Sequence, residues 1–492
     1  MTREVAAGTL VRMKDQPGLV VIDDGVVRRP RVFLEEERPM ADQVFIGEIV
    51  LPGRVIENGY VLAGDGLVQR VGEGPAPAGE RHGGPGCIVL PGAIDSQVHS
   101  RSQGDQEDFI WSTKSAAAGG VTTIVDMPYD EGRLISTAER FKAKASEAAA
   151  QTRIDFALYA TAAPEDGAAH IDALVAAGAA GFKFSTFGTH PQRFPRLPPQ
   201  ALYDCFGAIA RHGLISGIHN ENDEMVRAFV SRVMEQGLSD YAAHGMSRPP
   251  ITEALAMAEV YEIGAATGCS VHVVHCSISR GYDLAAAYRA QGFDATVEAC
   301  IHYLILDEEN DVRRLKGRGK VNPPIRPAAE REALWRHLAA GNIEVVSTDH
   351  VSWSADRKDN PDMLKNASGL PGLEVLVPLL LTGLEQRGLP MTLAARVLAS
   401  NPARLFRLGH VKGALAVGRD ADVVLMRRDP HRYEAAKSGA NVVDWSAYEG
   451  MPLGFTPEAV FLRAECVAAE GRVLAEPGRG AFLRPQIAAA AA

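Results

Sequence analysis

The chain has 492 residues, of which 46% are hydrophobic and 23% charged, and its formal net charge is −10. This length is too great for one small core, and the proportions are ordinary for a globular enzyme, which predicts a large domain with a smaller satellite. The negative charge argues against a nucleic-acid partner, because such partners are usually met by basic patches. No run of about twenty apolar residues is present, and the first residues lack the apolar core of a signal peptide, so we expect no membrane partner and a cytoplasmic location.

The N-terminal part of the chain divides into two stretches. Residues 1–43 have mixed charge and extra Val/Ile runs, and they are left as an unassigned extension. Residues 44–90 contain short strand-like runs separated by glycines, at Phe45–Leu51, Tyr60–Ala63 and Leu67–Val71. This second stretch predicts a small β domain.

From about Ile88 to Leu408, short β-rich runs alternate with Ala-, Leu- and Glu-rich helical segments. Eight such alternations in a continuous span predict an α/β fold, a (β/α)₈ TIM barrel, over residues 91–409. The expected strands are Ile88–His99, Val121–Met127, Ile154–Tyr159, Gly181–Ser185, Leu214–His219, Ser270–Cys276, Ala295–His302 and Ile343–Asp349. Helical segments include Leu134–Ala150, Pro198–His212, Ile251–Thr267 and Ala328–Ala340.

Two strand-like pieces, Lys412–Leu425 and Ala459–Leu474, follow the barrel, and the second turns at Glu470-Gly471. The Ala-rich end after Pro485 is expected to fray. The six cysteines include no C-x-x-C pair, so we expect reduced thiols rather than a disulfide framework.

Metal-ligand side chains recur at the ends of the expected barrel strands, where barrel enzymes carry their functional groups. The first strand ends in alternating Asp95, Gln97 and His99, and side chains two apart on a strand share one face. Later strands end in His219 and, at the eighth, in Asp349-His350. Imidazoles and a carboxylate that meet at one barrel mouth are what a zinc-type site requires. A core histidine and a solvated loop aspartate are the alternatives for His219 and Asp349.

Lys183 lies between Phe182 and Phe184 on the fourth strand, where a cation is costly to bury. The alternative to a functional role is that the Lys183 side chain extends to solvent or is paired with a carboxylate. In the sixth strand His272 and His275 are three apart and face opposite sides, so only one of them can enter the barrel mouth.

The run Leu90–Arg101 resembles the metal-binding strand of the amidohydrolase superfamily, in its cyclic-amidase branch of dihydroorotases, allantoinases, hydantoinases and dihydropyrimidinases. Further motifs that are similar to this branch are Cys300–Leu304, Gly369–Glu374 and Asn401–Arg404. The resemblance covers about Phe45 to Leu474. It implies that residues 44–90 and 410–475 form one composite β-sandwich, with residues 476–492 as a tail.

The resemblance also implies a site and a reaction. The implied metal ligands are Gln97, His99, Lys183, His219, His275 and Asp349. The cofactor would be zinc or another divalent metal, as one or two ions, with carboxylated Lys183 as a bridge. A metal-bound hydroxide would open a cyclic amide while Asp349 acts as the general base. His350 would contact the ligands without binding the metal itself. Homo-oligomers are common in the branch.

The substrate is left open by a mixture of motifs. Arg101 and Asn322 match residues that contact substrate in dihydroorotases, although a surface ion pair is an equal alternative for Arg101. Tyr129 and Trp353 depart from dihydroorotases, and Gly188 departs from hydantoinases. The ring of this small-molecule substrate could be an imide, a hydantoin, a ureide or a lactam.

Gln97 is the main departure from the branch, which has His-x-His where this chain has Gln97-x-His99. An amide oxygen is a weaker donor to zinc than imidazole, so the ion shared by His99 and Asp349 is expected to be held less tightly. A non-catalytic scaffold protein related to dihydropyrimidinase is therefore the second hypothesis. Against it, the other implied ligands are all present in the chain.

Overall fold

A computed structural model gives the structure of residues 41–130, 132–191 and 193–487, with the backbone of three short strands near the N-terminus. These strands, β1 (Thr9–Arg12), β2 (Leu19–Asp23) and β3 (Val26–Arg28), pair antiparallel as a separate sheet. The rest of the unassigned extension, and the end of the tail from residue 488, lie outside the described residues.

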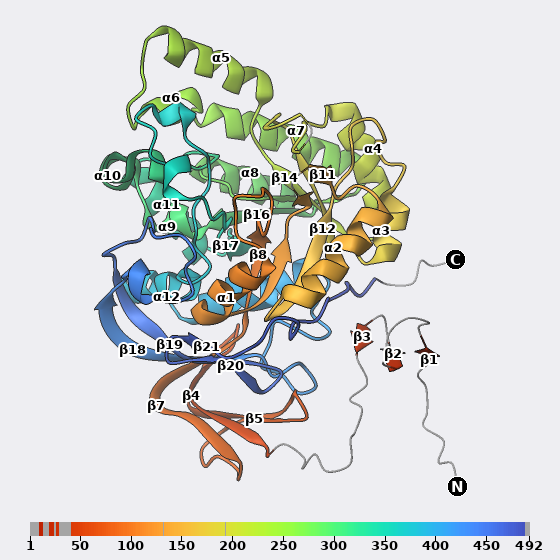
Figure 1. Cartoon of the computed structure of the whole chain (residues 1–492), viewed down its shortest axis with the longest axis vertical. Coiled ribbons are helices and arrows are strands. Elements are labelled where there is room, and N and C mark those ends of the chain that lie inside the picture. The colour runs from red at the N-terminus through yellow and green to blue at the C-terminus, as the bar shows by residue number, and fades with distance from the viewer. Residues whose placement is uncertain are drawn as a thin grey trace.

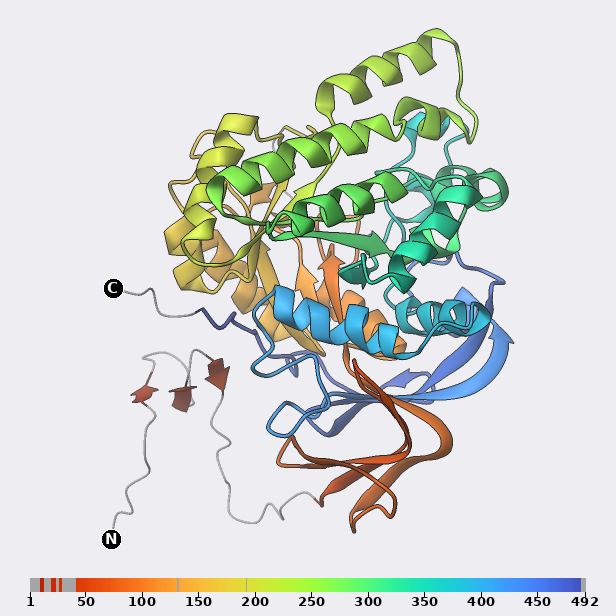
Figure 2. The ribbon, with the colours of Figure 1, turned by 180° about the vertical axis from the view of Figure 1, so that it is seen from behind.

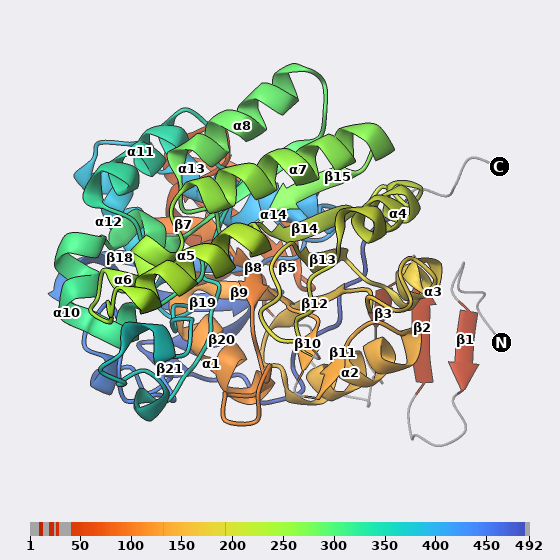
Figure 3. The same cartoon turned by 90° about the horizontal axis from the view of Figure 1, so that it is seen from above.

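Eight parallel strands form the centre of the molecule, with helices around them (Figures 1 and 3). The last strand meets the first: the His350 backbone N–H donates to the Gln97 carbonyl at 3.3 Å, and the His99 N–H donates to the His350 carbonyl at 3.0 Å. The predicted (β/α)₈ barrel is thereby confirmed. Its strands are β8 (Ala93–Val98), β9 (Val121–Asp126), β12 (Asp155–Ala160), β13 (Gly181–Ser185), β14 (Ile215–His219), β15 (Ser270–Val273), β16 (Ala295–Cys300) and β17 (Val345–Ser347).

Helices follow each barrel strand. Two strands of two residues each, β10 (Tyr129–Asp130) and β11 (Arg133–Leu134), also follow β9. Capping follows simple rules: the Asn222 side chain accepts from the Met225 N–H at the start of α5, and Gly120 ends α1 in the left-handed region. The helices are α1 (Phe109–Gly119), α2 (Ala138–Gln151), α3 (Ile171–Ala177), α4 (Pro199–Ala210), α5 (Asp223–Glu235), α6 (Ala243–Ser247), α7 (Ile251–Thr267), α8 (Ser279–Ala290), α9 (Ile301–Ile305), α10 (Arg313–Leu315), α11 (Ala328–Ala339), α12 (Leu376–Gln386), α13 (Thr392–Ala395) and α14 (Asn401–Leu405). No helix in the described ranges has the length and apolar character that crossing a membrane requires.

A second eight-stranded sheet, below the barrel in Figures 1 and 2, is built from both ends of the chain. Phe45 on β4 and Phe461 on β19 have ring centroids 4.7 Å apart, although two strands separate them in the sheet. A flat sheet would hold such residues roughly 14 Å apart, so this sheet curls into the predicted sandwich. Its strands are β4 (Gln43–Val50), β5 (Val55–Gly64), β6 (Leu67–Glu73), β7 (Glu80–Pro91), β18 (Val423–Arg432), β19 (Pro452–Leu462), β20 (Glu465–Ala469) and β21 (Arg472–Val473).

Two strand predictions are wrong at the junction of the domains. The run Ile88–His99 is not one strand, because the chain leaves the sandwich at Pro91 and enters the barrel at Ala93. Gly92 permits this passage, since a Cβ there would lie 2.2 Å from Thr122 Oγ1. The expected strand Lys412–Leu425 begins only at Val423, because the polar residues before it belong to an ion cluster rather than to a sheet.

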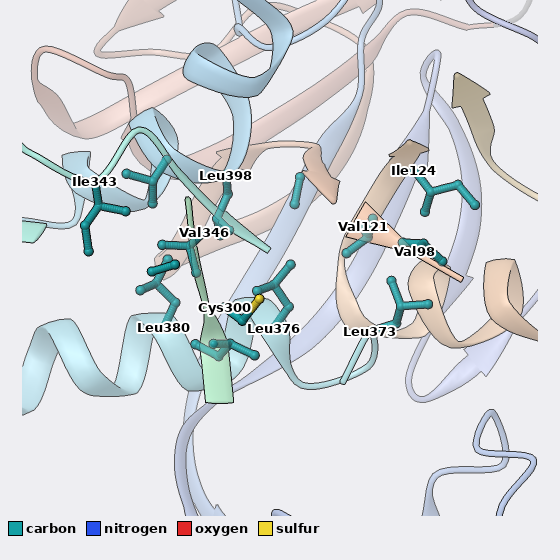
Figure 4. Close-up of a cluster of buried hydrophobic side chains, with 14 of the residues drawn as sticks. Val98, Val121, Ile124, Cys300, Ile343, Val346, Leu373, Leu376, Leu380 and Leu398 are labelled. Atoms are coloured by element: carbon teal, nitrogen blue, oxygen red, sulfur yellow. The ribbon is translucent and has the colours of Figure 1, made fainter. Parts of the chain in front are cut away.

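The hydrophobic core fills the space between barrel strands and helices. In Figure 4, Val98, Val121 and Ile124 from the first strands lie near Leu373, while Val346 lies among Leu376, Leu380 and Leu398. Helix α12 also packs against β19, which joins the barrel to the sandwich. All six cysteines are free thiols.

A buried ion cluster ties the two domains together beneath the barrel. Lys412 Nζ lies 2.6 Å from Asp155 on β12, 2.6 Å from Asp422 and 3.0 Å from Asp420. Burial opposes the charge of Lys412, but the three carboxylates outweigh it and raise the pKa of the ammonium above its usual value. Arg463 also pairs with Asp155.

We predict that Lys412→Met destabilises the protein by about 3–5 kcal/mol, because it leaves buried carboxylates without their cation. Lys437→Met is the matched control: its exposed pair with Glu434 contributes about 1 kcal/mol or less. Chemical unfolding of both variants gives the two values. Equal, small losses would show that the cluster does not hold the domains together.

Candidate active site

A cavity of about 380 Å³ opens at the carboxyl ends of the barrel strands. It collects side chains from distant parts of the chain because the ends of parallel strands meet at one edge. The predicted ligands that line it are Gln97, His99, Lys183, His219, His275 and Asp349. Two of them, His275 (φ 41°) and Asp349 (φ 47°), have left-handed backbone, a costly conformation that clusters at functional sites.

His219 and His275 form one pair of imidazoles. His219 Nδ1 lies 3.0 Å from His275 Nε2. Two nitrogens bound to one tetrahedral zinc ion lie about 3.3 Å apart, given Zn–N bonds near 2.0 Å. Burial lowers the pKa of both rings, which keeps them neutral, the form that binds metal.

Behind this pair, Glu221 and Arg248 fix the orientation of His219. His219 Nε2 lies 2.9 Å from Glu221 Oε2, which also accepts a hydrogen bond from Arg248. Burial opposes the Glu221 charge, but Arg248 and His219 outweigh it and lower the pKa of the carboxyl. A carboxylate on the far ring nitrogen is the usual support of a metal-ligating histidine. Neither residue was among the predicted site residues, although Glu221 lies only two positions after His219.

His99 and Asp349 form a second pair, with Gln97 beside it. His99 Nε2 lies 3.2 Å from Asp349 Oδ1, and Gln97 Nε2 donates to the same oxygen at 2.8 Å. Burial would raise the pKa of Asp349, but the hydrogen bond and charge of His99 outweigh it and lower that pKa. The carboxylate is therefore ionised at neutral pH.

Lys183 lies in the cavity wall, close enough to His219, His275 and Asp349 to interact with them electrostatically. Its side chain is buried, its Nζ donates to the Phe184 carbonyl at 3.3 Å, and it lies over the Phe194 ring. Burial, partly offset by Asp349 and Glu298, lowers the pKa of the amine to about 7. A substantial neutral fraction at physiological pH follows.

The donor set fits a divalent metal, provided that Lys183 contributes. Within residues 41–130, 132–191 and 193–487, no three His, Cys, Asp or Glu side chains gather as a ligand group. The cavity instead offers two pairs with Gln97 and Lys183 as additional donors. Of the predicted ligands, His275 Nδ1 and Gln97 Oε1 are buried and have no hydrogen-bond partner among the described residues. Unpaired buried polar atoms are costly, and a cation in the cavity would meet the Gln97 acceptor.

The residues predicted on the substrate side are separated by the fold. Asn322 lines the cavity, and its Oδ1 is a buried acceptor without a hydrogen-bond partner in the part of the chain that the structure describes. Arg101 lines a neighbouring pocket instead and pairs with Glu147. His350 faces away, with Nε2 on Glu107 and Nδ1 accepting from the Gly372 N–H at 3.0 Å.

Two other polar residues of the strand motifs lie in the core. Asp95 is not in the cavity wall, because its carboxylate accepts from the Gln97 and Thr348 backbone N–H groups. His272 is fully buried with Nδ1 2.8 Å from Thr296 Oγ1, so His275 is the histidine of this strand that reaches the cavity.

A cavity at the carboxyl ends of the strands is where barrel enzymes carry their active sites, and comparison with known proteins gives the family. Residues 88–467 match the amidohydrolase family model. An allantoinase from Rubrobacter xylanophilus is 35% identical over 460 residues, covering 89% of this chain and 97% of its own length. An L-hydantoinase from Paenarthrobacter aurescens is 30% identical over 404 residues, covering 81% and 88%. The chain therefore belongs to the amidohydrolase family.

A solved structure supports the same conclusion. The L-hydantoinase (dihydropyrimidinase) from Arthrobacter aurescens superposes with a TM-score of 0.86 at 29% identity, and the match covers 90% of this chain and all of the other. Metal dependence is general in this family.

We predict that Glu221→Gln weakens metal binding about 10- to 100-fold, because the amide no longer fixes the His219 ring as a carboxylate does. Glu224→Gln, at an exposed glutamate three residues further on in α5, is the control. Metal titration against a competing chelator measures both affinities. An affinity of Glu221→Gln equal to that of the control would show that Glu221 does not support a ligand.

Proposed function

We propose that this protein is a metal-dependent hydrolase that opens the ring of a cyclic amide at a C–N bond. The observation that carries the proposal is the geometry of the cavity, where two pairs of donors lie at co-ligand distances around one buried amine. Membership of the amidohydrolase family, and relatives named as allantoinases and an L-hydantoinase, support the same chemistry.

Lys183 would act as a carbamate. Its neutral amine adds to CO₂ with loss of one proton, so that a buried amine becomes a negatively charged carbamate. This change would complete both pairs, one with His219 and His275 and the other with His99 and Asp349. Zinc or another divalent metal, as one or two ions, would be held there, with Gln97 as a weak neutral donor.

Asp349 would be the general base of the reaction. The bound metal would supply Lewis-acid activation of water and of the ring carbonyl. Asp349 is ionised and lies beside His99 at the cavity floor, so its carboxylate can accept the proton of the attacking water. It would then return that proton to the ring nitrogen as the C–N bond opens.

The cavity wall favours a polar ring such as a hydantoin or a cyclic ureide. Asn322 Oδ1, which has no partner among the described residues, can accept a hydrogen bond from a ring N–H, which every unsubstituted ring of this kind carries. Other polar side chains, including Gln103, Gln106 and Thr189, also line the cavity. Arg101 reaches such a ring only if its pairing with Glu147 changes, and its substrate contact stays a prediction.

The non-catalytic scaffold hypothesis has no specific support. A scaffold has no use for neutral imidazoles held at co-ligand spacing with a carboxylate behind one of them. The cytoplasmic location and homo-oligomeric assembly stay predictions from the sequence and the family resemblance.

The function is tested with a panel of cyclic imides, hydantoins, ureides and lactams, assayed with the protein loaded with zinc, manganese or cobalt. Ring opening of at least one compound, abolished by a chelator and restored by metal, is expected. Metal-loaded protein that opens none of them would contradict the proposal.

We predict that Asp349→Asn lowers kcat by about 10²-fold or more, because general-base catalysis typically contributes that much. Metal content is measured on the same samples, since Asp349 is also an expected ligand. Asp283→Asn, at an exposed aspartate on α8, is the control. A near-normal rate in the Asp349 variant would place the base elsewhere.

The weak donor Gln97 predicts an order of metal release. Mild chelation should remove the ion at His99 and Asp349 before the ion at His219 and His275, and Gln97→His should strengthen the weaker site. Gln103→His, which adds an imidazole elsewhere on the cavity wall, is the matched control. Metal counting during stepwise chelation gives the order. Simultaneous loss from the native protein, unchanged in Gln97→His, would mean that Gln97 does not govern metal binding.

A further inference from the structure

The loop of residues 353–369, here called the wall loop, forms one side of the cavity. It follows β17 and contains two short 3₁₀ turns, Ala355–Arg357 and Met363–Lys365. Trp353, Arg357 and residues 367–369 line the cavity. The shape of the substrate cavity therefore depends on how this irregular segment is held.

Lys358 is the centre of the wall loop. Its side chain is fully buried, and its Nζ donates to the carbonyls of Lys320 at 2.8 Å, Ala367 at 2.8 Å and Gly369 at 2.9 Å. Three acceptors match the three N–H bonds of an ammonium group. Two of these carbonyls belong to the cavity-lining part of the loop, and the third belongs to a different segment.

Lys320 makes the complementary connection from that other segment. Its Nζ donates to the carbonyls of Leu364 at 2.6 Å and Asn366 at 2.7 Å. The backbone N–H of Gly369 in turn donates to the Lys320 carbonyl at 3.0 Å. Lys320 lies two residues before Asn322, which also lines the cavity, so these bonds join the wall loop to the Asn322 segment.

Burial of the Lys320 and Lys358 amines costs the folded protein stability. Burial lowers the pKa of Lys320 to about 8, and burial together with the nearby Lys320 lowers the pKa of Lys358. Among the described residues neither forms a salt bridge, and backbone carbonyls are the acceptors of both. Buried amines without a counter-ion reduce stability, so stability alone gives no reason for this arrangement. What these hydrogen bonds provide is a fixed position for the cavity wall.

We propose that Lys358, together with Lys320, is a positioning residue that fixes the wall loop against the Asn322 segment and so sets the shape of the substrate cavity on that side. This inference rests on the hydrolase function proposed above. Lys358 itself does not line the cavity and would touch neither substrate nor metal. Its loss should therefore weaken substrate binding and loosen the loop while the metal ligands stay in place.

The test compares Lys358→Met with Lys365→Met, a control at an exposed lysine of the same loop. Hydrogen exchange of the amides of residues 353–369 should be about tenfold faster in Lys358→Met than in the control. On the cyclic amide that the native protein opens, KM should rise about tenfold or more, with metal content unchanged and kcat within about threefold. In Lys358→Ala, added small alkylammonium ions should restore KM by occupying the carbonyl cage.

Three results would overturn the inference: exchange and KM equal to those of Lys365→Met, a loss of metal with unchanged KM, or no rescue by alkylammonium ions. If Lys358→Met does not fold, Lys320→Met is tested instead. It removes only the two bonds to the Leu364 and Asn366 carbonyls and is judged by the same exchange and KM criteria. A native protein that opens no cyclic amide would contradict the hydrolase function instead, and the exchange measurement would still decide whether Lys358 holds the loop.

Discussion

The burial of the Lys183 amine at the barrel mouth is the constraint on which the site depends. An ammonium there would repel a metal, and burial of the Lys183 side chain makes its charge costly. The low pKa of this amine shows that its surroundings disfavour the charge. The proposed conversion of the amine into a carbamate would remove this cost and would supply one more ligand to both donor pairs.

Barrel closure brings these groups together across long sequence separations. Asp349 reaches Gln97 and His99 only because β17 returns to β8, where backbone hydrogen bonds of His350 join the two strand ends. The sandwich and the Lys412 ion cluster hold the opposite end of the barrel. The site is therefore positioned by rigid strands, while the substrate wall is formed by loops that need their own anchors.

Most of the fold could be predicted from the sequence, and so could the meeting of the six strand-end side chains in one cavity, because strand alternation and strand-end residues are local signals. The runs at Gly181–Ser185 and Ile251–Thr267 match the structure residue for residue. Prediction failed at Lys412–Leu425, where polar residues serve a cluster with Asp155, more than 250 positions earlier, that no local pattern reveals. For the same reason the support of His219 by Arg248 and the Lys358 cage became visible only in three dimensions.

The account turns on the chemical state of Lys183, and ¹³C NMR of protein equilibrated with ¹³C-bicarbonate and divalent metal tests it most directly. We expect one carbamate carbon in the metal-loaded native protein, absent in Lys183→Ala and diminished when the metal is removed. An active, metal-loaded native protein without a carbamate signal would contradict the account.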